Sequence, residues 1–153
     1  MSPLDRELLS DVTASVLQDC AFLILDPAPM PDSWPSDMVS SGISFNGPLE
    51  GCLTLRAPSR ALPMIASDML GVFPEDFAAK VHGEAALREL SNVVVGVLLA
   101  RLVGDGPACQ IGLPVISHVP SLSRPSSRDT CSASFVDGEG QLFGVDLTIT
   151  RRG

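Results

Sequence analysis

The stretch GEAALRELSNVVVGVLLARLVG, residues 83–104, constrains the fold of this chain more than any other segment. Its apolar spacing predicts a helix, and at about 100° per residue the leucine and valine side chains spread around most of the circumference. Other elements must therefore cover this helix on most sides. The one narrow stripe left over carries Ala85, Glu89, Asn92 and Gly96, with Val103 at its far end. A carboxylate and an amide thus point the same way between small residues, where a partner surface could come close.

Before this helix, the sequence predicts a helix, a strand, a hairpin and a further helix. Ser2 and Pro3 are typical of a helix start, and the apolar spacing that follows continues to about Gln18. The run CAFLILD has the pattern of a buried strand, and PAPMPDSWPSDM that of a surface connection. Two β-rich runs in GISFNGPLEGCLTLR flank an Asn-Gly pair, which indicates a hairpin. Residues 59–70 have helical spacing and end at Gly71, a plausible C-cap.

A second helical stretch begins near Pro74 and either continues into the long helix or breaks near residues 82–83. After the long helix, CQIGLPVIS predicts a strand, and TCSASFVDGEGQLFGVDLTIT predicts a hairpin with its turn at residues 137–140. In its second arm, alternate apolar residues point to one face, namely Phe143, Val145, Leu147 and Ile149. This order predicts an α+β fold, a mainly antiparallel sheet covered by helices, with residues 1–153 forming a single domain.

Charge and cysteine spacing narrow the classes of function. With 18 acidic and 10 basic residues the net charge is −8, and no Lys/Arg cluster could follow a phosphate backbone, so we expect no nucleic-acid partner. The four cysteines are widely spaced in or beside apolar runs, without Cys/His pairing, and are interpreted as reduced core residues. No export signal and no apolar run of about 18 residues is present. We therefore expect a cytoplasmic protein with no membrane span and no metal site.

The chain also contains a short internal echo. Leu9-Ser10-Asp11-Val12 matches Leu90-Ser91-Asn92-Val93 at a constant offset, and each copy precedes strand-like sequence. The match is short enough to arise by chance, because leucine and valine recur in any amphipathic helix. If it reflects a duplication, the first copy has Leu8 and Asp11 where the second has Glu89 and Asn92, so one copy alone keeps the polar pair.

Three stretches within residues 42–118 share their order and spacing with one known family. SFNGPLEGCLTL is similar to its Phe-x-Gly strand pair, IASDMLG to the helix that follows, and GEAALRELSNVVVG to the helix with a Glu-x-x-Asn signature. LPVIS, with Pro114, is similar to its proline-bearing downstream strand. The chain thus resembles the CheC/CheX/FliY chemotaxis phosphatases, and most of all the single-site CheX branch. It departs from their pattern at Ala85, where the family has Asp or Ser, and in a proline about one residue nearer to Asn92.

This resemblance implies that the chain is a hydrolase acting on the aspartyl phosphate of a CheY-like response regulator, in chemotaxis or another two-component pathway. Asn92 would position the attacking water and Glu89 would contact the receiver domain. The small Ala85 and Gly96 would let the helix approach, and Pro114 would support the site. The regulator would provide Mg²⁺, so no cofactor of the chain itself is expected. The resemblance also implies a homodimer through sheet edges.

Three other interpretations of the polar stripe remain open. A Glu/Asn pair on a helix is often only the solvated side of an amphipathic helix. The chain could also be a non-catalytic binding module that docks a signalling partner through the same helix or an edge strand, an alternative that Ala85 favours. Finally, it could be a structural subunit whose stripe another chain covers. In the last two cases the stripe would bind a partner without hydrolysing anything.

Overall fold

The computed structural model describes residues 3–71, 73, 75–77, 81–118 and 129–152. Its helices are α1 (Pro3–Ala21), the 3-10 helix η1 (Ser59–Ala61), α2 (Leu62–Leu70) and α4 (Gly83–Val103). Its strands are β1 (Asp26–Ala28), β2 (Met38–Asn46), β3 (Leu49–Pro58), β4 (Gln110–Ile111), β5 (Val115–Ser117), β6 (Thr130–Val136) and β7 (Leu142–Arg152). The predicted α+β class is confirmed, as are both predicted hairpins, β2–β3 and β6–β7.

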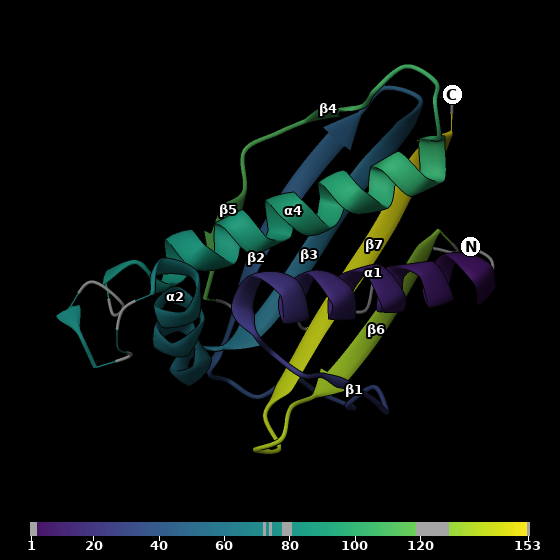
Figure 1. Ribbon diagram of the computed structural model, residues 1–153. Coiled ribbons are helices and arrows are strands. Elements are labelled where there is room, and N and C mark those ends of the chain that lie inside the picture. Colours follow the sequence, from purple (N-terminus) through teal and green to yellow (C-terminus); the bar gives the residue numbers. More distant parts are fainter. Residues whose placement is uncertain (1–2, 72, 74, 78–80, 119–128, 153) are drawn as a thin grey trace.

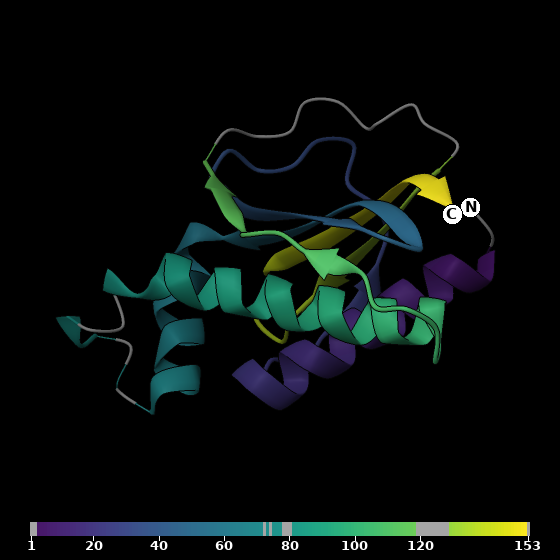
Figure 2. The same ribbon diagram turned by 90° about the horizontal axis from the view of Figure 1, so that it is seen from above.

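The strands form one antiparallel sheet in the order β1-β6-β7-β3-β2, and β4 and β5 both pair along the outer edge of β2. In Figure 1, α1, α2 and α4 all lie in front of the sheet. Figure 2, turned by 90°, shows the helices as one layer and the strands as another. The core fills the space between the layers, and the alternating residues predicted to share one face of β7 are all buried there: Phe143, Val145, Leu147 and Ile149.

The sheet consists of two similar halves. In the first half α1 leads to β1 and then to the hairpin β2–β3, and in the second α4 leads to β4 and β5 and then to the hairpin β6–β7. The halves meet at the central pair β3–β7, where Leu53 lies opposite Leu147. Each half also exchanges its short outer strand, because β1 pairs with β6 and β5 pairs with β2. The internal echo of the sequence is therefore part of a repeat of whole helix-strand-hairpin units.

A buried charged pair lies on the sheet face that the helices leave open. Arg56 on β3 donates to Asp146 on β7, and their side chains are 7% and 13% exposed. Ser132 on β6 donates to the other carboxylate oxygen of Asp146 at 2.6 Å. The ring of Trp34 lies over the Arg56 guanidinium, with its centre 5.7 Å from the guanidinium carbon. A Cβ atom at Gly144 would be 2.4 Å from the Trp34 ring, so only glycine fits beneath the tryptophan.

The interpretation of CAFLILD as a buried strand is wrong. α1 takes up its first two residues, and the chain then turns sharply at Phe22, which has a φ of 55°. Leu23 and Leu25 pack against the core, whereas Phe22 and Ile24 are exposed. The strand of this region is β1, which begins only at the end of the run and has three residues. These four residues therefore alternate between exposed and core-facing positions, but they form an extended connection at the edge of the core and not a strand.

Two further expectations are corrected or resolved. The strand predicted over CQIGLPVIS is broken into β4 and β5, because Pro114 lies between them and has no N–H to donate. The long helix begins at Gly83, so it is not continuous with the stretch before it. The predicted helix start at Ser2, the start near Pro74 and most of VPSLSRPSSRD lie outside the described residues.

All four cysteines are free, but the interpretation as core residues holds for Cys131 alone, because Cys20, Cys52 and Cys109 are only half-buried. Burial, and to a lesser degree the negative charge of Asp5, raises the pKa of the Cys131 thiol to about 11. Cys131 therefore stays protonated near neutral pH.

Among the described residues, no helix has the length and apolar content needed to cross a membrane.

Candidate functional site

The apolar face of α4 fixes this helix against the sheet and the other helices. Its buried side chains are Ala86, Leu87, Leu90, Val94, Val95, Leu98 and Leu99. At its first residue, Gly83, the helix touches the start of α2, where an added Cβ would be 2.8 Å from the Leu62 Cβ. A larger residue would push the two helices apart, so this glycine helps to determine where α4 begins.

A buried hydroxyl pair fixes the rotation of α4 about its axis. Ser41 on β2 and Ser91 on α4 are fully buried, and their Oγ atoms are 2.7 Å apart. The Ser91 hydroxyl donates to the Arg88 carbonyl at 2.8 Å, so Ser41 is the donor to Ser91. Because Ser91 directly precedes Asn92, a bond that holds Ser91 toward the sheet directs Asn92 away from it.

A contact between His118 and Glu84 lies at the start of α4, beside the sheet edge. His118, directly after β5, has its Nε2 atom 3.3 Å from a carboxylate oxygen of Glu84. Both side chains are well exposed, so the pair contributes little stability by itself. The contact marks where the end of β5 lies, beside the turn of α4 that carries Ala85.

The predicted stripe faces outward. Ala85, Glu89 and Asn92 are exposed and Gly96 is half-exposed. No hydrogen bond or ion pair joins the side chain of Glu89 or Asn92 to another residue of the described ranges. A Cβ atom at Gly96 would meet nothing within 4 Å, so this glycine leaves open space on the helix surface rather than packing against a strand. The helix therefore presents a carboxylate and an amide to an incoming surface.

The exposed side of α4 is wider than the sequence predicted. Val97, assigned to the apolar wall, is 38% exposed, and Val93 is only half-buried. Beyond Gly96 the surface is hollowed by about 230 Å³, between the last turns of α4 and the segment that leads to β4. This hollow is lined by Gly96, Leu99, Ala100, Val103, Gly104, Gly106, Ala108, Cys109 and Ile111. A partner that touches the stripe would therefore find apolar surface beside it.

Pro114 is half-buried at the break between β4 and β5, and no described hydrogen bond connects this loop to Glu89 or Asn92. Its neighbour Gly112 donates its N–H to the Ser44 carbonyl at 2.8 Å, which keeps the interrupted edge attached to β2. The proline thus interrupts the sheet edge, and its support of the polar stripe stays a prediction.

The first half has no equivalent polar pair. On α1, the echo positions of Glu89 and Asn92 hold Leu8, which is half-buried against the core, and Asp11, which is exposed. Leucine can neither accept nor donate a hydrogen bond, so α1 lacks the combination that α4 presents. Among the described residues, no group of His, Cys, Asp and Glu side chains is arranged to hold a metal ion.

Sequence reasoning missed two contacts between α4 and the sheet, the Ser41–Ser91 bond and the Glu84–His118 contact. Ser41 and Ser91 are 50 positions apart, and Glu84 and His118 are far apart as well, so both pairs arise only when α4 docks on the sheet. A serine in the middle of an apolar helix was the available signal for the first, because a buried hydroxyl needs a partner. Nothing in the sequence pointed to the second.

Comparisons with known proteins point to one family and one fold. The family model described as chemotaxis phosphatase CheX matches residues 39–135. The fold resembles that of CheX in the CheX-CheY-BeF3-Mg complex from Borrelia burgdorferi, with a TM-score of 0.71 and 20% identity over 95% of this chain and 97% of that one. It also resembles a chemotaxis protein CheX from Desulfovibrio desulfuricans, with a TM-score of 0.73 and 16% identity over 95% and 99% of the two chains.

A CheC-like superfamily protein from Shewanella gives a TM-score of 0.73 and 20% identity over 99% of this chain and 100% of that one. No curated protein sequence matches the chain at a significant level. At these identities the structural likeness establishes the fold, whereas the family model rests on the sequence itself. Because that model covers well over half of the 153 residues, including Glu89 and Asn92, the chain belongs to the CheX family of chemotaxis phosphatases.

Proposed function

We propose that this protein hydrolyses the aspartyl phosphate of a CheY-like receiver domain, with Asn92 positioning the attacking water and Glu89 contacting the regulator. The observation that carries the proposal is the exposure of both side chains on one stripe of α4, free of partners in the described part of the chain. Membership of the chemotaxis phosphatase family supports it. So does the related B. burgdorferi protein, whose complex contains CheY, BeF3 and Mg²⁺.

Phosphoryl transfer from an aspartate needs little covalent work from a catalyst. The rate rises when a water molecule is held in line with the phosphorus atom and when charge in the transition state is neutralised. The amide of Asn92 can both accept from and donate to that water without competing for its proton. The Mg²⁺ would come with the receiver, so this chain needs no metal of its own for the reaction.

Glu89 has a separate task in this proposal. A carboxylate that projects from α4 can make a charge-assisted hydrogen bond with a lysine of the receiver. Ala85 and Gly96 have little or no side chain on either side of the pair, which allows the receiver to approach the helix backbone closely. The two roles predict different effects, because loss of Glu89 lowers affinity and loss of Asn92 slows the reaction.

Glu89→Ala is expected to weaken binding of the phosphorylated receiver by about tenfold or more, because one charge-assisted bond is lost. The measurement is the dissociation constant in titrations with Mg²⁺ present. Glu7→Ala is the matched control, since Glu7 is an exposed glutamate on α1. Equal affinities of wild type and Glu89→Ala would exclude the contact role of Glu89.

The second candidate function is a binding module that docks a receiver without hydrolysing its phosphate. The observation in its favour is Ala85, which is exposed one turn before Glu89 where the family pattern has Asp or Ser. The two candidates separate in one experiment: a module binds the receiver but leaves its phosphate lifetime unchanged, whereas a phosphatase shortens that lifetime.

We also propose that two chains pair along the edge formed by β4 and β5. Leu113 and Val115 are 88% and 68% exposed on this edge, and unpaired edge strands readily pair with another chain. Gel filtration over a range of concentrations should give a dimer for wild type and a monomer for Val115→Lys, because an edge lysine disfavours pairing. A wild-type monomer at every concentration would contradict the proposal.

A further inference from the structure

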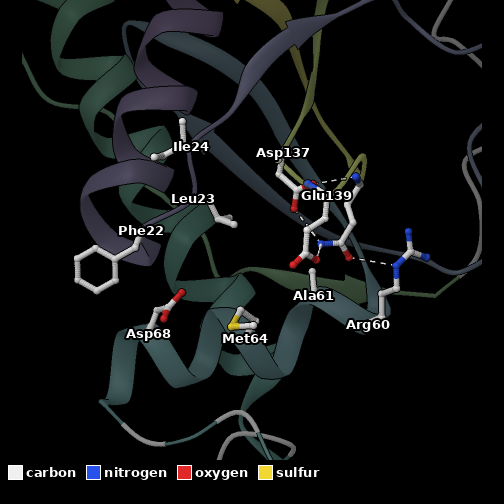
Figure 3. A pocket seen from close by; sticks show the side chains of 11 residues that line it. Phe22, Leu23, Ile24, Arg60, Ala61, Met64, Asp68, Asp137 and Glu139 are labelled. Atoms are coloured by element: carbon white, nitrogen blue, oxygen red, sulfur yellow. Dashed lines mark hydrogen bonds between the residues drawn. The ribbon is translucent and has the colours of Figure 1, made fainter.

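A second hollow lies at the opposite end of the helix layer from the C-terminal end of α4. Its volume is about 590 Å³, and it lies between the end of α1, the start of α2 and the β6–β7 turn (Figure 3). Phe22 and Asp68 lie at one end, Glu139 and Arg60 at the other, and Met64 between them. No residue of α4 lines this hollow, so a molecule bound here would not compete for the polar stripe.

Phe22 is conformationally unusual. Each of the described helices α1, α2 and α4 is followed by a residue with positive φ whose N–H bonds to the carbonyl four positions earlier, but α2 uses Gly71 and α4 uses Gly104, each with a φ of 73°. α1 ends at Phe22 with a φ of 55°, and among the described residues this is the one non-glycine with positive φ. Glycine would end the helix without strain, so helix termination does not explain the phenylalanine.

Internal packing does not account for a phenylalanine at position 22 either. The residue is 69% exposed, and its neighbours in the hollow, Ile24 and Met64, are 72% and 46% exposed. The positive φ of Phe22 strains the backbone, and its exposed ring leaves apolar surface in water. Each effect lowers the free energy of unfolding of the isolated chain. Strain that persists for no internal benefit commonly belongs to a site of contact with another molecule.

The polar part of the hollow is acidic. Asp68, Asp137 and Glu139 contribute three carboxylates, and the single cation, Arg60, is already paired with Asp37 at 2.9 Å. The Asp137 carboxylate is engaged in the turn, accepting from Gln141 and from backbone N–H groups. Asp68 and Glu139 have no cationic partner among the described residues. Partial burial raises the pKa of the Asp68 carboxyl, so a cation beside it would replace lost hydration.

We propose that this hollow binds a peptide segment of a partner protein in which large apolar side chains stand beside lysine or arginine. The apolar side chains would cover Phe22, Ile24 and Met64, and the cations would meet Asp68 and Glu139. The walls are too exposed to enclose a small molecule on most sides, as small-molecule sites do. A second copy of this chain would bring acid against acid, and nucleic acid or an anionic membrane would be repelled.

The test uses the full chain and three labelled peptides of equal length: an amphipathic Leu/Lys peptide, a Leu/Glu peptide and a Ser/Lys peptide. Fluorescence anisotropy should show that wild type binds the first and neither of the others. Phe22→Gly should lower the affinity for the Leu/Lys peptide by about 30-fold, as loss of an aromatic anchor does. Because glycine suits a positive φ, the variant should keep a Tm at or above that of wild type.

Two charge variants complete the test. Asp68→Asn should also weaken binding of the Leu/Lys peptide, whereas Asp105→Asn, an exposed carboxylate that does not line the hollow, should not. Equal binding of the Leu/Lys peptide to wild type and Phe22→Gly would overturn the proposal, as would equal binding of all three peptides. Phe22→Gly should leave the phosphate lifetime of a receiver unchanged, so the outcome is independent of the proposed phosphatase function.

Discussion

Asn92→Ala is expected to slow hydrolysis of the receiver phosphate by about 100-fold or more, if the proposed phosphatase function holds. The physical reason is that a water molecule out of line with the phosphorus by about 1 Å can cost this much rate. Removing a preorganised hydrogen-bonding group at a reacting centre has effects of similar size, on the order of 100- to 1,000-fold. The measurement is the lifetime of the phosphorylated receiver with saturating wild type or variant.

The fold should not be affected by this change. The Asn92 side chain is exposed and has no hydrogen-bond partner among the described residues, and alanine has a higher helix propensity than asparagine. The thermal midpoint should therefore stay within a few degrees of wild type. Affinity for the receiver should also change little, because we propose that Glu89 makes the main contact with it.

The internal repeat offers a matched control for Asn92. Asp11→Ala removes an exposed polar side chain from the echo position on α1, where the hydrophobic Leu8 replaces Glu89. This variant should have the phosphatase activity of wild type. Identical phosphate lifetimes with wild type and Asn92→Ala would contradict the catalytic role, and equal losses in Asn92→Ala and Asp11→Ala would mean that neither position acts specifically.

Asp146→Ala is expected to destabilise the protein by about 3–5 kcal/mol, because it leaves the guanidinium of Arg56 buried without its counterion. For a chain of this length, that corresponds to a fall in Tm of roughly 10 °C. The Ser132 hydroxyl also loses its acceptor, and the contact of Trp34 with the pair should loosen. Thermal unfolding followed by circular dichroism measures the effect, and Trp34 fluorescence reports the local change.

Asp37→Ala is the matched control, because it breaks a more exposed carboxylate–arginine pair, with Arg60. Exposed pairs contribute about 0–1 kcal/mol, so this variant should unfold close to wild type. The double variant Arg56→Met/Asp146→Leu should recover most of the stability, since replacing both buried charges by apolar groups is often neutral. Equal losses in Asp37→Ala and Asp146→Ala would refute the assignment of the buried pair as the stabilising one.

Elements whose signals are local could be predicted from the sequence. The long helix, the hairpin around the Asn-Gly pair and the Gly71 helix end each depend on side chains a few positions apart, and the structure has all three. The outward direction of Glu89 and Asn92 also follows from helix winding alone. Local patterning thus gave the fold class and the exposed face of α4.

Elements that depend on neighbours in space could not be predicted in the same way. The apolar run that includes Phe22 and Ile24 has strand-like composition, but a strand also needs a pairing partner, which sequence periodicity does not reveal. The Ser41–Ser91 bond and the Glu84–His118 pair likewise join distant segments. Their existence depends on how α4 docks on the sheet, which no single segment encodes.

The exchange of outer strands between the two halves has a consequence for the history of such a chain. After a duplication, a copy that loses its active residues would ordinarily be free to decay or be deleted. Here the first copy supplies the strand that lies beside β6, and its own β2 is lined by β4 and β5 of the second copy. Removing the half with Leu8 and Asp11 would strip the other half of its sheet partners. The first half is therefore structurally required by the second, and the two unequal helices α1 and α4 belong to one sheet that cannot be divided between them without unpairing strands.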